Sequence, residues 1–78
     1  MEKVKVKICG VEEVSTALEA EKYGADYIGL VFCKKSKRCI SVDKAKEIIL
    51  SLKSSVSIVA LFSNDEKIYV RSIMDKIQ

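Results

Sequence analysis

The chain begins with a strict alternation of apolar and polar residues that predicts a β-strand from Val4 to Gly10. Successive strand side chains point to opposite sides, so the two kinds of residue fall on different faces. The apolar face consists of Val4, Val6 and Ile8, and the polar face of Lys5, Lys7 and Cys9. Gly10 can adopt backbone angles closed to other residues, and an acidic, helix-prone stretch follows it. We therefore expect Cys9 at the carboxyl end of a strand, beside the N-terminus of a helix.

Two further apolar stretches predict strands, and the first has the composition of a central strand. Residues 27–32 are apolar almost without interruption, as expected of a parallel strand that is covered on both faces. Gly29 within this run leaves room for the close approach of another backbone or of a ligand. Residues 56–62 are rich in β-branched side chains and predict the third strand.

Helical spacing of apolar residues follows each of these strands. The first helix is expected from about Glu12 to Tyr23, with Gly24 in the left-handed conformation that ends many helices. Ser41 is placed to cap the second helix, and a capping-box pattern at 63–66 leads into the third. The expected core-facing residues are Val14, Ala17, Leu18 and Ala20 in the first helix, Ala45, Ile48, Ile49 and Leu52 in the second, and Val70, Ile73, Met74 and Ile77 in the third.

A strand followed by a helix, three times over, places the chain in the α/β class. Right-handed units of this kind give parallel strands with every carboxyl end on one rim, although they leave the strand order open. Helices on one side of such a sheet leave its other face bare, and that face includes Lys5, Lys7 and Cys9. A polar inner face is typical of a (β/α)8 barrel, so we expect residues 1–78 to form a single, incomplete barrel segment.

Composition narrows the class of protein. Of the 78 residues, 49% are hydrophobic and 32% are charged, which is typical of a globular chain. No apolar run approaches the ~20 residues that a membrane span needs. A chain of this size buries only about 60% of its unfolded surface, so its stability alone is expected to be marginal.

The cysteines and the missing histidine limit the chemistry. An odd number of cysteines, Cys9, Cys33 and Cys39, occurs without an export signal, so we expect thiols in the cytoplasm rather than a disulfide framework. Cys33 and Cys39 alone do not make a structural zinc site, because such a site takes four ligands. The absence of histidine excludes Ser-His and Cys-His nucleophile pairs and imidazole metal ligands.

Most of the excess positive charge lies in the polar loop at 33–41, which leaves the carboxyl end of the second strand. The net charge is only +3, and the loop cations are Lys34, Lys35, Lys37 and Arg38. Such a local concentration favours an anion site over a nucleic-acid surface, which would spread its basic residues along a face. Arg38 is the candidate ligand because a guanidinium can hold a carboxylate through two hydrogen bonds. The plainer interpretation of the run is a solvated charged surface.

Cys9 is the candidate for proton chemistry. The thiolate is the reactive form of cysteine, and a helix N-terminus and Lys7 on the same strand face favour it. The neighbouring Glu12 and Glu13 oppose it. The plainer interpretation of Cys9 is a small residue buried in apolar surroundings, the usual fate of a cysteine outside a disulfide.

Five short motifs recur in the order and spacing of one enzyme family. They are Val6-Lys7-Ile8-Cys9-Gly10, Gly24-Ala25-Asp26 with Gly29-Leu30-Val31-Phe32, Lys35-Ser36-Lys37-Arg38, Ile40-Ser41, and Ala60-Leu61-Phe62-Ser63-Asn64. Through them essentially the whole chain resembles the N-terminal part of phosphoribosylanthranilate isomerase, whose fold is a (β/α)8 barrel. Another sugar-phosphate barrel enzyme would leave the motifs around Cys9 and Arg38 unexplained.

The resemblance implies an Amadori rearrangement in tryptophan biosynthesis, which is an aldose–ketose isomerisation. N-(5′-phosphoribosyl)anthranilate opens its sugar ring to an imine, and loss of the C2′ proton gives an enolamine that becomes the ketose product. No cofactor is implied. The resemblance also implies that Cys9 is the general base and that Arg38 contacts the anthranilate end of this sugar-phosphate substrate.

The resemblance places the family's general acid and phosphate site on later strands. The chain also stops inside an amphipathic helical pattern, which is typical of a truncated protein. We therefore expect a segment of the isomerase that is inactive alone. The alternative is a non-catalytic piece that associates with itself or complements other barrel strands, because open sheet edges pair with further strands.

Overall fold

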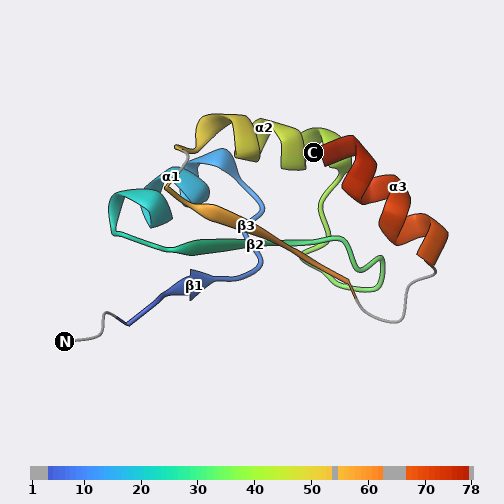
Figure 1. Ribbon diagram of the computed structural model, residues 1–78, viewed down its shortest axis with the longest axis horizontal. Helices are drawn as coiled ribbons and strands as arrows, with labels where there is room; N and C mark the ends of the chain where they lie inside the picture. The colour runs from blue at the N-terminus through green and yellow to red at the C-terminus, as the bar shows by residue number, and fades with distance from the viewer. Residues whose placement is uncertain (1–3, 54, 63–66, 78) are drawn as a thin grey trace.

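The computed structural model describes residues 4–53, 55–62 and 67–77, which alternate between strands and helices (Figure 1). In chain order the elements are β1 (Lys7–Ile8), α1 (Val14–Lys22), β2 (Tyr27–Val31), α2 (Val42–Ser51), β3 (Ser57–Leu61) and α3 (Lys67–Ile77). The strands are parallel in the order β1-β2-β3, so their carboxyl ends meet at one rim. The α/β class, the alternating order and the central position of the second strand are thereby confirmed.

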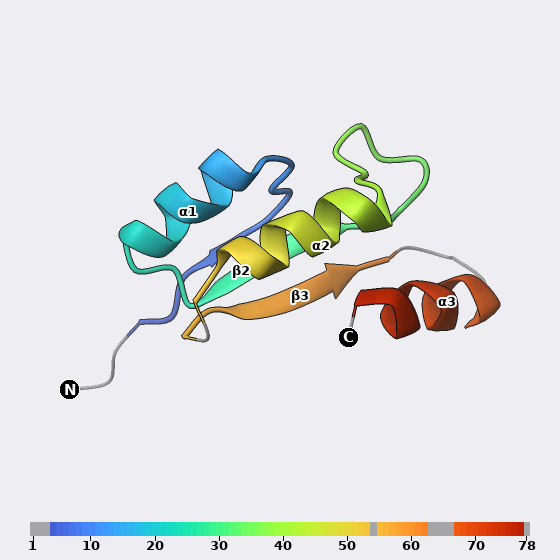
Figure 2. The same ribbon diagram turned by 90° about the horizontal axis from the view of Figure 1, so that it is seen from above.

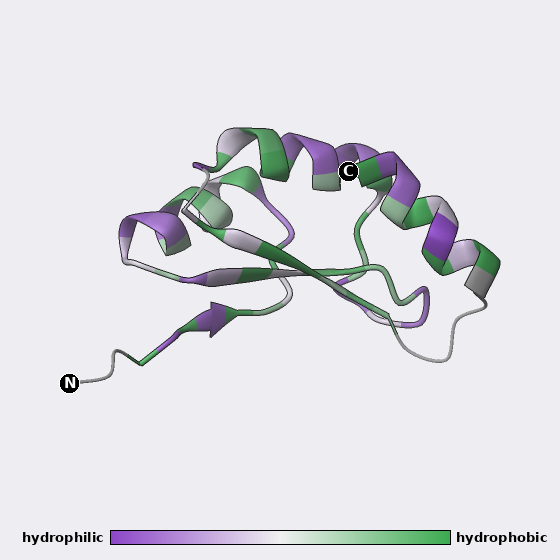
Figure 3. Cartoon of the chain, viewed as in Figure 1, coloured by the Kyte–Doolittle hydropathy of each residue, from purple (hydrophilic) through white to green (hydrophobic). Residues whose placement is uncertain are grey.

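The core lies between the sheet and the helices, which gather on one side of it (Figures 1 and 2). Alternate residues of the second strand region, Ile28, Leu30 and Phe32, are each 0% exposed. They pack against Ala17 from α1, Ala45 and Ile48 from α2, and Ile73 from α3. Figure 3 shows apolar residues along β2 and β3, while each helix combines apolar and polar residues. The hydrophobic pattern therefore identifies the face that each element buries.

Leu18 is the exception among the expected core-facing residues of the first helix. It is 43% exposed, whereas Ala17 is fully buried. Consecutive helical residues lie about 100° apart around the axis. With Ala17 at the centre of the contact, Leu18 falls on the flank of α1, so its assignment to the core was wrong.

The second face of the sheet carries no helix among the described residues, and we call it the open face. Because strand side chains alternate, its residues are Tyr27, Gly29 and Val31 from β2 and Ser57, Val59 and Leu61 from β3. Lys5 reaches this face as well, with its Nζ 5.9 Å from the centre of the Tyr27 ring. The expectation of a sheet face without a helix over it is confirmed for the described residues, although Gly29 and Val31 of β2 are buried on this face.

The first strand is shorter than the alternation predicts, because its ladder with β2 covers only Lys7–Ile8. Before it, Val6 is held by the turn that precedes β2: its N–H donates to Asp26 Oδ2 at 2.8 Å, and its carbonyl accepts from the N–H groups of Asp26 and Tyr27. Val4 lies before the paired residues and is 80% exposed. A strand is hydrogen-bonded only where a neighbouring strand runs beside it. Because β2 begins after the turn at Asp26, the residues before Lys7 have no strand to pair with in the part of the chain that the structure describes.

The helix boundaries follow local capping. Gly24 has φ 88° after α1, as predicted. Ser41 caps α2, its Oγ accepting from the N–H of Lys44 at 3.1 Å. Helix α1 begins at Val14, because the preceding Glu13 is extended. The predicted capping box at 63–66 lies outside the described residues. None of the helices in the described ranges has the length and apolar composition needed to cross a membrane.

Candidate active-site corner

The corner begins where β1 turns into the approach to α1. Gly10 has φ 72°, a left-handed conformation that favours glycine. The N–H groups of Gly10 and Val11 both donate to the carbonyl of Gly29, at 3.0 and 3.2 Å. Val11 is then buried in the core, at 1% exposed. This double hydrogen bond and the buried Val11 fix the backbone on either side of the turn, directly after Cys9.

Cys9 lies on the open face beside Gly29, and its side chain is exposed. A Cβ added to Gly29 would lie 3.3 Å from the Cα and 3.4 Å from the Sγ of Cys9, and 3.2 Å from Cδ1 of Leu61. A larger residue would crowd these neighbours. The predicted close approach at Gly29 is thereby confirmed, and its partner is Cys9. The alternative of a buried Cys9 is wrong in this structure.

The loop after β2 folds back on itself and places Arg38 at the same corner. The N–H of Arg38 donates to Ser36 Oγ at 3.1 Å, and the N–H of Ile40 donates to the carbonyl of Val31 at 2.9 Å. The Arg38 side chain lies on Gly10: a Cβ there would sit 2.6 Å from its Cζ and 2.8 Å from its Cδ. The Arg38 side chain therefore covers Gly10, the residue that directly follows Cys9 in the chain.

Tyr69 of α3 anchors the start of this loop, a role that the sequence reasoning missed. Its hydroxyl donates to the carbonyl of Phe32 at 2.6 Å, and the Nζ of Lys34 lies 4.4 Å from the centre of its ring. The Tyr69 ring also meets that of Phe62 edge-on, with centroids 6.0 Å apart. The available signal was the spacing of Tyr69 and Ile73, which are four residues apart on the core-facing side of α3.

The other residues of the loop differ in exposure and in their local contacts. Lys35 and Lys37 are exposed, while Cys33 and Cys39 are half-buried. The Sγ of Cys39 points to the carbonyl of Ile40, at 3.9 Å. In the part of the chain that the structure describes, no three cysteine or carboxylate side chains are grouped so as to hold a metal ion. The chemistry of the corner is thus that of a thiol and a guanidinium.

We expect Gly10→Ala to destabilise the fold more than Gly24→Ala does. Both glycines have positive φ, 72° and 88°, so alanine costs roughly 1–2 kcal/mol of backbone strain at either position. At Gly24 no described atom lies within 4 Å of the added Cβ, whereas at Gly10 Arg38 must also leave its place. Urea unfolding followed by circular dichroism measures both losses. Equal losses would contradict the packing of Arg38 on Gly10.

Comparison with known proteins identifies the family. The family model described as N-(5'phosphoribosyl)anthranilate (PRA) isomerase matches residues 6–78. The chain belongs to this family. Among the curated relatives, the N-(5'-phosphoribosyl)anthranilate isomerase of Stutzerimonas stutzeri is 45% identical over 74 residues, which cover 95% of the chain and 36% of the relative. That of Neisseria gonorrhoeae is 42% identical over 77 residues, covering 99% of the chain and 37% of the relative.

Solved phosphoribosylanthranilate isomerases share the fold described above. The structure from Thermotoga maritima superposes with a TM-score of 0.91 at 38% identity, covering 97% of the chain and 37% of that protein. The structure from Thermus thermophilus gives 0.90 at 32% identity, covering 95% and 37%. The three βα units therefore have the arrangement of part of a (β/α)8 barrel, and the chain spans 36% to 37% of the length of these relatives.

Proposed function

We propose that this chain contributes the general base and the anthranilate-binding arginine of a phosphoribosylanthranilate isomerase, acting in tryptophan biosynthesis in the cytoplasm. The observation that supports this most strongly is the contact between Arg38 and Gly10, which places a guanidinium beside the backbone that carries Cys9. Both groups lie at the carboxyl ends of parallel strands, where (β/α)8 enzymes carry their active sites.

The proposed reaction needs one proton acceptor on the open face. After the sugar ring of N-(5′-phosphoribosyl)anthranilate has opened to the imine, the Cys9 thiolate takes the proton from C2′, and the electron pair of that C–H bond forms the enolamine. Exposure of Cys9 lets a substrate reach the sulfur, and Gly29 beside it adds no side chain to the approach. Only protons move, so no cofactor is required.

Arg38 is proposed to hold the anthranilate carboxylate. A planar guanidinium makes two parallel hydrogen bonds to a carboxylate and so fixes its orientation as well as its position. One solved relative is in complex with reduced 1-(o-carboxyphenylamino)-1-deoxyribulose 5-phosphate, and the chain matches it with a TM-score of 0.91 at 38% identity. That ligand carries a carboxyphenyl group at one end and a phosphate at the other, which is the chemistry that the proposal requires.

The chain on its own is expected to show no isomerase turnover. The proposal draws its general acid and phosphate site from barrel strands outside residues 1–78, and a general acid alone contributes about 10² to 10⁴ in rate. The test is turnover of phosphoribosylanthranilate by the purified chain, alone and after mixing with a polypeptide that supplies the remaining strands of a relative. Turnover only in the mixture supports the proposal, whereas folded mixtures without turnover would contradict it.

A second candidate function is a non-catalytic piece that associates with itself or complements other barrel strands. It is favoured by the exposure of apolar side chains along the N-terminal edge, where Val4 is 80%, Val6 45% and Ile8 37% exposed. An exposed apolar edge of this kind promotes pairing with another chain. We propose self-association for this reason under either function, and the mixing assay separates them, since a non-catalytic piece gives assembly without turnover.

A further inference from the structure

Tyr69 contacts the chain at the point where the second strand region ends and the loop at 33–41 begins. Its hydroxyl donates to the carbonyl of Phe32 at 2.6 Å, in half-buried surroundings. The N–H of Phe32 still belongs to the sheet, since it donates to the carbonyl of Leu61 at 2.9 Å. Figures 1 and 2 show the first turn of α3 at the same end of the sheet as this loop. The hydroxyl therefore holds the place at which the loop leaves the sheet.

The position of Tyr69 is itself fixed by the core. Ile73 is buried at 6% exposed, and Tyr69 lies four residues before it, on the same face of α3, and packs against the same cluster. The ring of Phe62 meets the Tyr69 ring edge-on, with centroids 6.0 Å apart. The Nζ of Lys34 lies 4.4 Å from the centre of the Tyr69 ring, within the range of cation–π attraction. Tyr69 thus contacts both the backbone before the loop and a side chain within it.

Short-range hydrogen bonds lead from this point to Arg38. The carbonyl of Cys33, which directly follows Phe32, accepts from the N–H of Ser36 at 3.0 Å. The Oγ of Ser36 in turn accepts from the N–H of Arg38 at 3.1 Å. The backbone of Arg38 is therefore placed by a turn that starts directly after the carbonyl that Tyr69 holds.

The two ends of the loop are held by adjacent carbonyls. The carbonyl of Val31 accepts from the N–H of Ile40 at the returning end, at 2.9 Å, and the carbonyl of Phe32 accepts from Tyr69 at the other end. Arg38 is exposed between them. Its position therefore depends on the backbone of the loop rather than on burial in the core.

We propose that Tyr69 is a positioning residue for the anthranilate end of the substrate: through the loop, it holds Arg38 in the conformation that receives the carboxylate. This rests on the proposed function and adds a residue of α3 to its site. A loop that reaches the binding conformation for only part of the time binds its ligand more weakly, in proportion to that fraction. Loss of the Tyr69 hydroxyl should therefore weaken substrate binding.

The same loss should leave the proton transfer unchanged, because Cys9 is held by other contacts. The N–H groups of Gly10 and Val11, the two residues after Cys9, both donate to the carbonyl of Gly29. None of these bonds involves Tyr69 or the loop. An effect on KM without an effect on kcat thus separates a positioning role from a general disturbance of the fold.

Tyr69→Phe tests the proposal in the chain mixed with the polypeptide that supplies the remaining barrel strands. It removes the hydroxyl and keeps the ring that packs against the core and lies near Lys34. The net contribution of one hydrogen bond corresponds to a factor of about 2 to 10 in the population of the conformation that it holds. KM for phosphoribosylanthranilate is therefore expected to rise about 2- to 10-fold, while kcat stays at the parent value.

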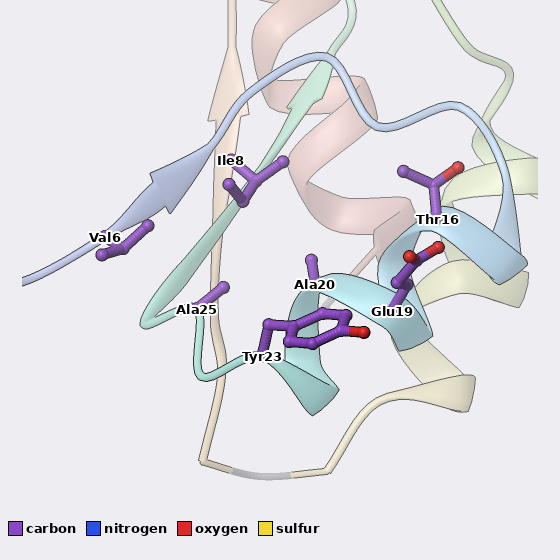
Figure 4. Close-up of a pocket in the computed structure, with 7 residues that line it drawn as sticks. All are labelled: Val6, Ile8, Thr16, Glu19, Ala20, Tyr23 and Ala25. Carbon is purple, nitrogen blue, oxygen red and sulfur yellow. The ribbon is translucent and has the colours of Figure 1, made fainter.

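Tyr23→Phe is the matched control, because it removes the same atom from a tyrosine that lies elsewhere. Tyr23 is 77% exposed at the end of α1, where it lines a groove between β1 and α1 (Figure 4). We expect the parent KM and kcat from this variant. A second comparison uses Arg38→Ala as the background. There Tyr69→Phe should raise KM no further, because no guanidinium is left to position.

Amide hydrogen exchange in the full 78-residue chain gives a readout that needs no turnover. The N–H groups of Ser36 and Arg38 should exchange about 2 to 10 times faster in Tyr69→Phe than in the parent chain, because the loop opens more often. The N–H of Val11 should keep its rate. Tyr23→Phe should leave all three rates unchanged.

A fall in kcat at unchanged KM in Tyr69→Phe would overturn the inference. So would unchanged exchange at Ser36 and Arg38, or a full further rise in KM in the Arg38→Ala background. The two kinds of readout also separate the proposals. A mixture without turnover whose loop amides respond to Tyr69→Phe overturns the proposed function and supports the hold of Tyr69 on the loop. An active mixture with an unresponsive loop overturns only the role of Tyr69.

Discussion

Cys9→Ala is expected to lower kcat/KM for phosphoribosylanthranilate by a factor of about 10² to 10⁴ in an assembly that includes the remaining barrel strands. The reason is that alanine has no group to accept the C2′ proton, while the surrounding backbone keeps its hydrogen bonds to Gly29. Cys9 is exposed on the open face. The substitution should therefore leave folding intact, and the loss should appear in the rate rather than in the amount of folded protein.

Cys39→Ala is the matched control for this experiment. It removes the same atom from a half-buried thiol whose Sγ lies 3.9 Å from the carbonyl of Ile40. We expect kcat/KM to stay within a few-fold of the parent value. Equal losses from the two substitutions would assign the effect to general disturbance of the rim, and the base would then have to be sought elsewhere.

Phe32→Ala is expected to remove most of the stability of the chain and to lower the urea concentration at which it unfolds. Phe32 is 0% exposed, its ring lies 5.7 Å from that of Phe62, and its carbonyl accepts the hydrogen bond from Tyr69. Truncating a buried phenylalanine costs about 3–5 kcal/mol. A domain of this size has at best about 5–15 kcal/mol of stability, and small ones lie at the lower end.

Urea unfolding monitored by circular dichroism checks this expectation. Leu50→Ala is the control, because Leu50 is 85% exposed and such surface changes usually alter stability by less than about 0.5 kcal/mol. If Phe32→Ala unfolds at the same urea concentration as Leu50→Ala, the core is not centred on the second strand as the structure has it.

The covered strand and its helices could be predicted from the sequence because their signals are local. The apolar run at 27–32 predicts a strand that is buried on both sides. Ser41 could be predicted as the cap of α2, because its own hydroxyl accepts the capping hydrogen bond. The true length of β1 could not be predicted, since it depends on where Asp26 turns the neighbouring backbone. An alternating pattern predicts which face of the sheet a side chain lies on. It does not predict how many residues of the neighbouring strand are available for pairing.

Some features of the candidate site could also be predicted from the sequence, while others depend on the fold. Cys9 and Gly10 could be singled out from the sequence, because the strand pattern ends there in a turn. Arg38 could be singled out because it is the one guanidinium in a loop of lysines. The contact of Arg38 with Gly10 could not be predicted, because it depends on the hydrogen bonds of Ser36 and Ile40 that fold the loop back. Tyr69 was missed for a related reason: its partner, the carbonyl of Phe32, is a backbone atom 37 residues away.

The most direct test of the proposed site is a chimera in which residues 6–78 replace the matching segment of the Thermotoga maritima enzyme. The account predicts that the chimera converts phosphoribosylanthranilate to the ketose product, and that Cys9→Ala within it lowers kcat/KM for this conversion by a factor of about 10² to 10⁴. A chimera that folds cooperatively and yet shows no turnover would contradict the claim that this corner carries an isomerase site. Undiminished turnover after Cys9→Ala would contradict the role assigned to the thiol.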